Sequence, residues 1–140
     1  MKRLIGFLSV STLAVALAAT LAAQTIRVTA RVPFEFMVAG RSMPAGDYTV
    51  EHSGSTAAIR VSNGSTGVLS LAMNSSASPH EQAGQALLIF HRYGDQYFLS
   101  RIVDGSRNTV VELPTSRTEK ELSKTASLEK FETVAVLARR

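Results

Sequence analysis

The sequence predicts an all-β fold, an antiparallel β-sandwich or flattened barrel of about eight or nine strands with one short C-terminal helix. Three observations lead to this prediction. Apolar and polar residues alternate in several segments, as they do in strands with one buried face. Two tight-turn dipeptides, Asn63-Gly64 and Gly94-Asp95, separate pairs of such segments. Only one segment, after Pro114, carries a helix start signal.

Residues 1–23 have the pattern of a secretory signal peptide, followed by a single β domain at residues 24–140. Lys2 and Arg3 precede a long uncharged stretch that ends in small residues. Cleavage after Ala18, Ala22 or Ala23 fits this pattern, and the choice stays open. The alternative is an uncleaved anchor, because the uncharged stretch is long enough to span a bilayer. We therefore expect an exported protein, either periplasmic or secreted.

The charge and the cysteine content of the sequence argue against several covalent links and binding partners. The sequence has no cysteine, so neither disulfides nor a cysteine-linked lipid anchor can form. Without Lys2 and Arg3, the 15 basic residues fall to 13 against 11 acidic ones, a net charge of +2. These basic residues are scattered, whereas nucleic-acid binding needs a concentrated basic face. We expect no nucleic-acid partner, and membrane contact only through the signal segment before cleavage.

The first half of the domain predicts strands and turns in alternation. Apolar residues occupy every even position from Ile26 to Val38, with Pro33 at a bend between two strands. Residues 40–46 (GRSMPAG) predict a turn-forming loop, and residues 47–52 another strand. A hairpin then pairs residues 57–62 with 66–73 around Asn63-Gly64.

That hairpin places Ile59 opposite Val68 and Val61 opposite Thr66 when its turn has two residues. Residues 74–84 (NSSASPHEQAG) are polar and small, and they predict a long loop.

The densest group of reactive side chains lies in HRYGDQYFLSR, residues 91–101. Gly94-Asp95 predicts a hairpin of residues 86–93 and 96–103, in which His91 opposes Phe98 and Arg92 opposes Tyr97. Both faces of this hairpin are largely apolar, so it should be central and covered on two sides. With Asp95 at the tip, we expect that His91, Asp95 and Ser100 do not converge as a catalytic triad.

The C-terminal part predicts a strand, a helix and a last strand. Residues 108–113 form the strand, which Pro114 ends. Ser116 and Glu119 match a capping box, so a small surface helix should run to about Ser127. Residues 132–138 (ETVAVLA) predict a final buried strand.

The chain lacks the usual sequence signals of catalysis and metal binding. The histidines His52, His80 and His91 do not have the spacing that puts two ligands on one element. Nucleophile-elbow, phosphate-loop and β-lactamase-type motifs are absent. We expect no catalytic residues, no metal and no cofactor.

A candidate contact surface comes from the central hairpin. Arg92, Tyr97 and Arg101 share one strand phase, and tyrosine with arginine is a frequent combination at binding surfaces. The alternative is that the rings fill the core while the arginines extend to its rim.

Three segments together resemble a family of small exported proteins of unknown function from acidobacteria. They are VPFEFMVAGRSMPAGDYTV (residues 32–50), LIFHRYGDQYFLSRIV (88–103) and ELPTSRTEKEL (112–122). Typical members have a tryptophan soon after the hairpin, where this chain has Ile102-Val103. The shared motifs are turns, core aromatics and a helix cap, so the resemblance implies relatives but assigns no site residue.

The function expected from these observations is a non-catalytic binding or structural module of the cell envelope. Its partner would be an envelope protein, a peptide or a saccharide. A small secreted hydrolase, and a subunit of an envelope assembly with an unpaired edge strand near Pro33, are the alternatives.

Overall fold

The computed structural model describes residues 25–53, 58–76, 84–105, 109–125 and 131–140. The predicted signal peptide at residues 1–23 and its candidate cleavage positions lie outside the described residues.

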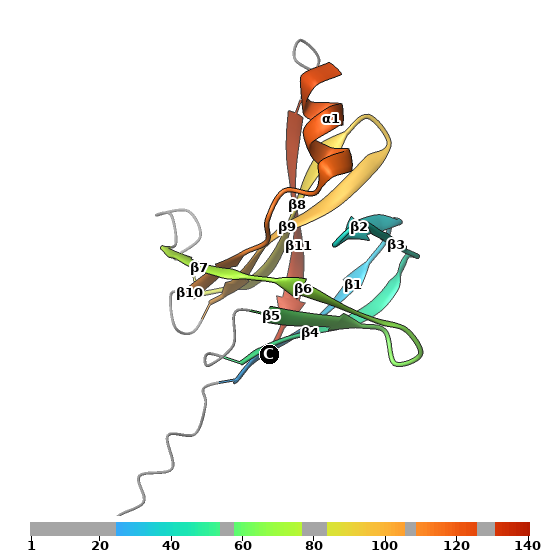
Figure 1. The fold of residues 1–140 in the computed structure, drawn as a ribbon. Coiled ribbons are helices and arrows are strands. Elements are labelled where there is room, and N and C mark those ends of the chain that lie inside the picture. The colour runs from blue at the N-terminus through green and yellow to red at the C-terminus, as the bar shows by residue number, and fades with distance from the viewer. Residues whose placement is uncertain (1–24, 54–57, 77–83, 106–108, 126–130) are drawn as a thin grey trace, which may run out of the picture.

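The described chain forms strands and one helix, α1 (Arg117–Thr125) (Figure 1). The strands are β1 (Thr25–Val32), β2 (Phe36–Val38), β3 (Arg41–Met43), β4 (Gly46–Ser53), β5 (Ala58–Ser62), β6 (Gly67–Leu71), β7 (Met73–Ser76), β8 (Ala86–Tyr93), β9 (Gln96–Asp104), β10 (Thr109–Glu112) and β11 (Phe131–Arg139).

The strands form one sheet that curls into a nearly closed barrel. Its main path is β3-β2-β9-β8-β11-β1-β4-β5-β6, while β10 pairs with both β9 and β7. Only Ala72 separates β6 from β7, so this length of chain pairs with β5 at one end and with β10 at the other. The prediction of an all-β flattened barrel with one late helix is confirmed. One pair departs from the antiparallel prediction, because β2 runs parallel to β9.

The apolar side chains, which alternate with polar ones along the strands, point into the barrel interior. In β1 every second residue is buried, from Ile26 to Val32, which confirms the predicted alternation. Pro33 follows β1 directly and separates it from β2, as predicted. At the centre, Phe90 is fully buried, with its ring edge-on to Phe34 and Phe36 at centroid distances of 5.0 and 5.2 Å.

Two predicted loops contain strand. Residues 41–43 form β3, and the chain turns at Ala39 and Gly40, whose φ angles of 50° and 77° are positive. Residues 73–76 form β7, because they find a partner in β10. The partner of β3 is β2, which precedes it across this turn, whereas the partner of β7 lies far along the chain.

Two further predictions need correction. In the β5–β6 hairpin Val61 opposes Val68, two residues away from the predicted register. The side chain of Asn63 explains the shift, since it accepts bonds from the backbone N–H groups of Ser65 and Thr66 and widens the turn. The final strand β11 is half-exposed where a buried strand was predicted, and Leu137 is 68% exposed.

The β8–β9 hairpin has the predicted register near its turn and an irregularity further along. Arg92 opposes Tyr97 and His91 opposes Phe98, which confirms the prediction. The hairpin is also central, because β11 lies on its β8 side and both β10 and β2 lie on its β9 side. A bulge then leaves Ser100 without an opposite residue, so that Arg101 opposes Ile89.

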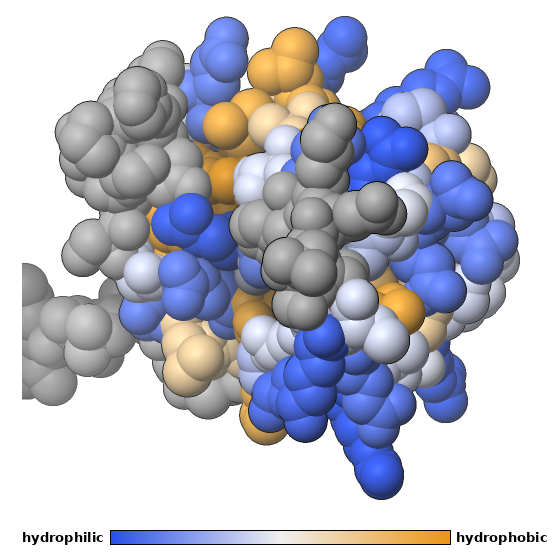
Figure 2. Space-filling model, turned by 90° about the horizontal axis from the view of Figure 1, so that it is seen from above, coloured by the Kyte–Doolittle hydropathy of each residue, from blue (hydrophilic) through white to orange (hydrophobic). Residues whose placement is uncertain are grey.

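Helix α1 begins at the predicted cap, where the backbone N–H of Glu119 donates to Ser116 Oγ at 3.1 Å. It lies beside the β8–β9 hairpin (Figure 1). Its buried residue is Glu119, whereas its apolar residue Leu122 is only half-buried. Seen from the α1 end, hydrophilic residues cover much of the molecule (Figure 2).

Candidate functional site

A partly buried polar network joins the central hairpin to α1. His91 Nδ1 lies 2.7 Å from Glu119 Oε1, and the hydroxyl of Tyr93 donates to the same oxygen at 3.2 Å. On the other side of the imidazole ring, Ser100 Oγ lies 3.0 Å from His91 Nε2. The four side chains therefore form a continuous chain of contacts from β9 through β8 to the helix.

Local structure explains why these side chains meet. His91 and Tyr93 are two residues apart on β8 and so project from the same face. Phe98 opposes His91, and Ser100, two residues beyond Phe98, lies diagonally across from His91 on that face. The helix cap places Glu119 in the first turn of α1, where it reaches the same surface.

Burial makes this network energetically important. Glu119 is only 4% exposed, and a carboxylate removed from water must be hydrogen-bonded or paired. Burial, then the neighbouring charge of Glu119 and the hydrogen bond to it, together raise the pKa of Tyr93 to about 12. The carboxylate thus keeps the Tyr93 hydroxyl protonated as a donor.

The order of contacts is that of a serine, a histidine and a carboxylate in a hydrolase triad. His91 and Ser100 thus lie in contact, which the hairpin register alone did not predict. The prediction for Asp95 holds, since it lies exposed at the turn and the carboxylate comes from Glu119 instead. Sequence reasoning missed Glu119, because a capping-box glutamate is ordinarily a surface residue. Ser100 itself is 9% exposed.

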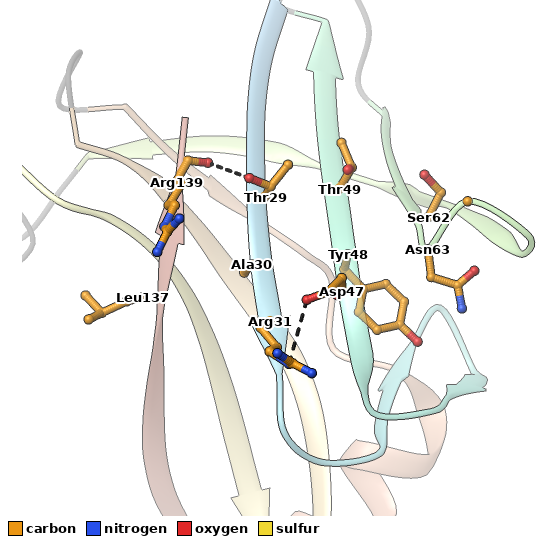
Figure 3. Close-up of a pocket in the computed structure, with 11 residues that line it drawn as sticks. Thr29, Ala30, Arg31, Asp47, Tyr48, Thr49, Ser62, Asn63, Leu137 and Arg139 are labelled. Atoms are coloured by element: carbon orange, nitrogen blue, oxygen red, sulfur yellow. Dashed lines mark hydrogen bonds and ion pairs between the residues drawn. The ribbon is translucent and has the colours of Figure 1, made fainter.

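A second site is a groove of about 740 Å³ on the outer surface of β11, β1, β4 and β5 (Figure 3). Strand pairing places Arg139, Thr29, Thr49 and Ser62 in one row across the four strands. The hydroxyl of Thr29 donates to the backbone oxygen of Arg139 at 3.3 Å. The row therefore presents side-chain hydroxyls at the regular spacing of adjacent strands.

Charged and apolar groups complete the groove. Arg31 Nε lies 3.9 Å from Asp47 Oδ1, and both side chains are more than 80% exposed. Leu137 adds an exposed apolar surface on one side, and Asn63 contributes an amide on the other. The lining thus offers donors, acceptors and charges of both signs.

The predicted contact surface is brought together in part. The Arg92 guanidinium lies 5.5 Å from the centre of the Tyr97 ring, and its Nη1 is 3.1 Å from Glu132 Oε2. Tyr97 is half-buried and stacks on Phe34 at 3.8 Å. The bulge turns Arg101 to the opposite face, where its Nε lies 3.3 Å from Glu112 Oε1. Arg101 therefore does not share a surface with the other two residues.

No group of three or more histidine, cysteine, aspartate or glutamate residues that could hold a metal ion occurs in the described part of the chain. His52 is buried on β4, and His80 lies outside the described residues. Within the described ranges no helix has the length and apolar character needed to cross a membrane.

The chain matches no protein-family model, no curated protein and no solved structure. Its resemblance to the exported acidobacterial proteins therefore stays a prediction from the three segments that carry it.

Proposed function

We propose that this protein is an exported, non-catalytic module of the cell envelope that binds a saccharide in the groove across β11, β1, β4 and β5. The groove, with its row of hydroxyl-bearing side chains, is the observation that supports this function (Figure 3). Export is inferred from the signal-peptide pattern of residues 1–23.

The floor of the groove favours a saccharide over a peptide. Peptides commonly add to a sheet through free backbone N–H and C=O groups at an edge strand. Here β4 pairs with β1 and β5, and β1 pairs with β4 along its whole length and with β11 at Thr29 and Ala30, so both strands have neighbours on each side in the row that lines the groove. The groove therefore contacts a ligand through side chains.

The lining groups match the chemistry of a sugar. Thr49 and Ser62 each offer a hydroxyl that can donate and accept, as sugar hydroxyls do. The Thr29 hydroxyl donates to the backbone oxygen of Arg139 and can still accept a hydrogen bond. Arg31 and Asp47, a cross-strand pair two residues along β1 and β4 from this row, add a charged donor and a charged acceptor. The exposed side chain of Leu137 can pack against the C–H face of a sugar ring.

Calorimetric titration of the purified protein with chitotriose, cellotriose and a trigalacturonate tests the proposal. We expect at least one of the three to bind and a tri-alanine peptide not to bind. Replacing both Thr29 and Thr49 by valine removes two hydroxyls without changing side-chain shape, and should weaken binding at least about tenfold.

The matched control is Thr118→Val, at an exposed position on α1. It should leave affinity unchanged. The proposal is wrong if none of the three saccharides binds, or if the double valine variant binds as tightly as the control. Binding of the peptide alone would instead identify a peptide-binding protein.

The serine–histidine–glutamate contacts favour a second candidate, a small hydrolase. In that reaction Ser100 Oγ attacks an ester carbonyl while its proton passes to His91 Nε2. The departing alkoxide takes this proton and leaves an acylated Ser100, which water then hydrolyses. The structural role of the network competes with this candidate, because the same contacts are needed to satisfy the buried carboxylate of Glu119.

A fluorophosphonate probe distinguishes the two roles. An activated serine gives a covalent adduct on Ser100, detected by peptide mass spectrometry, and the Ser100→Ala variant gives none. We expect no adduct on the wild-type protein, consistent with a non-catalytic module. A stoichiometric adduct at Ser100 would instead establish the hydrolase and remove "non-catalytic" from the proposed function.

A further inference from the structure

The helix α1 is attached to the barrel in an unusual way, because it buries a charged residue and no complete apolar side chain. Its sequence is RTEKELSKT, and Glu119 is its buried residue. Leu122 is half-buried, and the remaining helical residues are exposed. Most helices in globular proteins are held by an apolar stripe, which this one lacks.

The contacts of Glu119 are therefore central to the docking of α1. Oε1 of this carboxylate meets both His91 and Tyr93 of β8. The other polar side-chain contacts along the helix stay within it, such as the pair between Arg117 and Glu121. Before the helix, Leu113 fixes the entering chain, since its N–H donates to the backbone oxygen of Ser100 at 2.8 Å.

These contacts make the docking of α1 all-or-none. A buried carboxylate that loses its partners is costly, so the helix would move Glu119 into water before it would keep the charge buried. Once undocked, a helix of nine residues is only marginally stable in water, so it would also lose its helical structure. Docking and helix formation are thus coupled.

We propose that α1 is a releasable strap, held on the β8–β9 hairpin by the Glu119 carboxylate, that leaves the barrel as a unit without unfolding it. Release opens the outer face of the hairpin around His91. That face carries Tyr93, whose hydroxyl loses its Glu119 partner on release, and the ring of Tyr93 lies edge-on to the buried Phe98. The strap is separate from the groove, which α1 does not line.

Hydrogen–deuterium exchange followed by mass spectrometry tests the strap on the purified protein. In the Glu119→Ala variant, peptides from residues 114–125 should exchange at least about tenfold faster, while peptides from β1 and β4 keep their wild-type rates. Glu119→Gln retains a carbonyl acceptor without the charge, so its effect should be intermediate. Glu121→Gln, at an exposed position of the same helix, should resemble wild type.

Two outcomes of this experiment would contradict the proposal. If exchange in β1 and β4 rises together with that of α1, the helix belongs to the same cooperative unit as the barrel and is not a strap. If α1 keeps its protection in Glu119→Ala, the carboxylate does not hold it. His91→Phe provides an independent variant from the other side of the contact, and it should release α1 in the same way.

Discussion

At the scale of single residues, Glu119 determines the properties of its neighbours. Three polar side chains, His91, Tyr93 and indirectly Ser100, are oriented by one carboxylate oxygen or by the imidazole that contacts it. The same geometry can serve a structural or a chemical role, and the burial of its members bears on the choice between them. Ser100 is 9% exposed and Glu119 4%, which favours a structural role.

The pKa of Tyr93 gives a prediction at this scale. Its folded value of about 12 lies above the ordinary value of 10.0, so folding favours the protonated phenol. The stability that this preference contributes is fully present below about pH 10 and is lost as the pH rises through about 12. Burial also raises the pKa of Tyr48, so tyrosinate absorbance in an alkaline titration should show a late component from both residues. Tyr93→Phe should reduce the amplitude of this component and leave the part that belongs to Tyr48.

The variant Glu119→Gln provides the control for this assignment, because it removes the charge that opposes ionisation. The part of the late component that belongs to Tyr93 should then move toward lower pH. A titration of the variant that coincides with wild type would show that Glu119 does not raise the pKa.

At the scale of elements, the close approach of two backbone segments explains why residue 105 is a glycine. A Cβ added to Gly105, which follows β9, would fall on the backbone of Gly84 and Gln85, which precede β8. Backbone atoms cannot move aside as a flexible side chain can, so Gly105→Ala should destabilise the protein by about 2 kcal/mol or more.

Urea denaturation measures this cost, and Gly46→Ala is the matched control. At Gly46 the nearest neighbour of the added Cβ is a ring atom of Tyr48, at an ordinary 3.9 Å. The control should be unchanged or slightly more stable, because alanine loses less backbone entropy than glycine in a strand. Equal stability of the two variants would contradict the close approach.

The elements also show which features the sequence determines locally. Strict alternation from Ile26 onward predicts β1 correctly, because one side of the strand faces the core. At the β5–β6 turn the predicted register is two residues off, yet Val61 and Val68 still face inward, because a slip of two preserves the face. The sequence pattern thus predicts which face of a strand is buried better than it predicts the length of a turn.

The candidate sites were harder to predict, because they depend on contacts between distant segments. The capping box predicts where α1 begins, but nothing in it indicates that Glu119 reaches His91, 28 residues earlier. The bulge that separates Arg101 from Tyr97 has no sequence signal such as glycine at Ser100. The groove arises only when four strands are placed in order, and the position of β11 between β8 and β1 is not encoded locally.

At the scale of the whole molecule, barrel closure depends on one continuous length of chain. β6 and β7 join β5 to β10 across Ala72, which is buried. The outer side of this chain carries the exposed residues Leu69, Leu71 and Met73. Because the sheet curls back on itself, its apolar interior is enclosed without disulfides, which the cysteine-free chain cannot form.

Stability must therefore come from the packing of the barrel interior, and Phe90 gives the sharpest test. Its ring is fully buried and contacts Phe34 and Phe36, which lie far from Phe90 in the sequence. Phe90→Ala removes buried surface and leaves a cavity, so we expect a loss of about 3–5 kcal/mol in the free energy of unfolding. That is a large part of the roughly 5–15 kcal/mol typical of a domain.

Leu69→Ala is the control for this prediction, because Leu69 is 73% exposed on β6 and should change stability by no more than about 0.5 kcal/mol. Urea denaturation followed by far-ultraviolet circular dichroism measures both variants. If Phe90→Ala unfolds at the wild-type midpoint, the aromatic cluster does not form the centre of the core. If it unfolds in two separate transitions, β8 and the β1–β4 part of the barrel are independent units, in contrast to the single curled sheet that closes around Phe90.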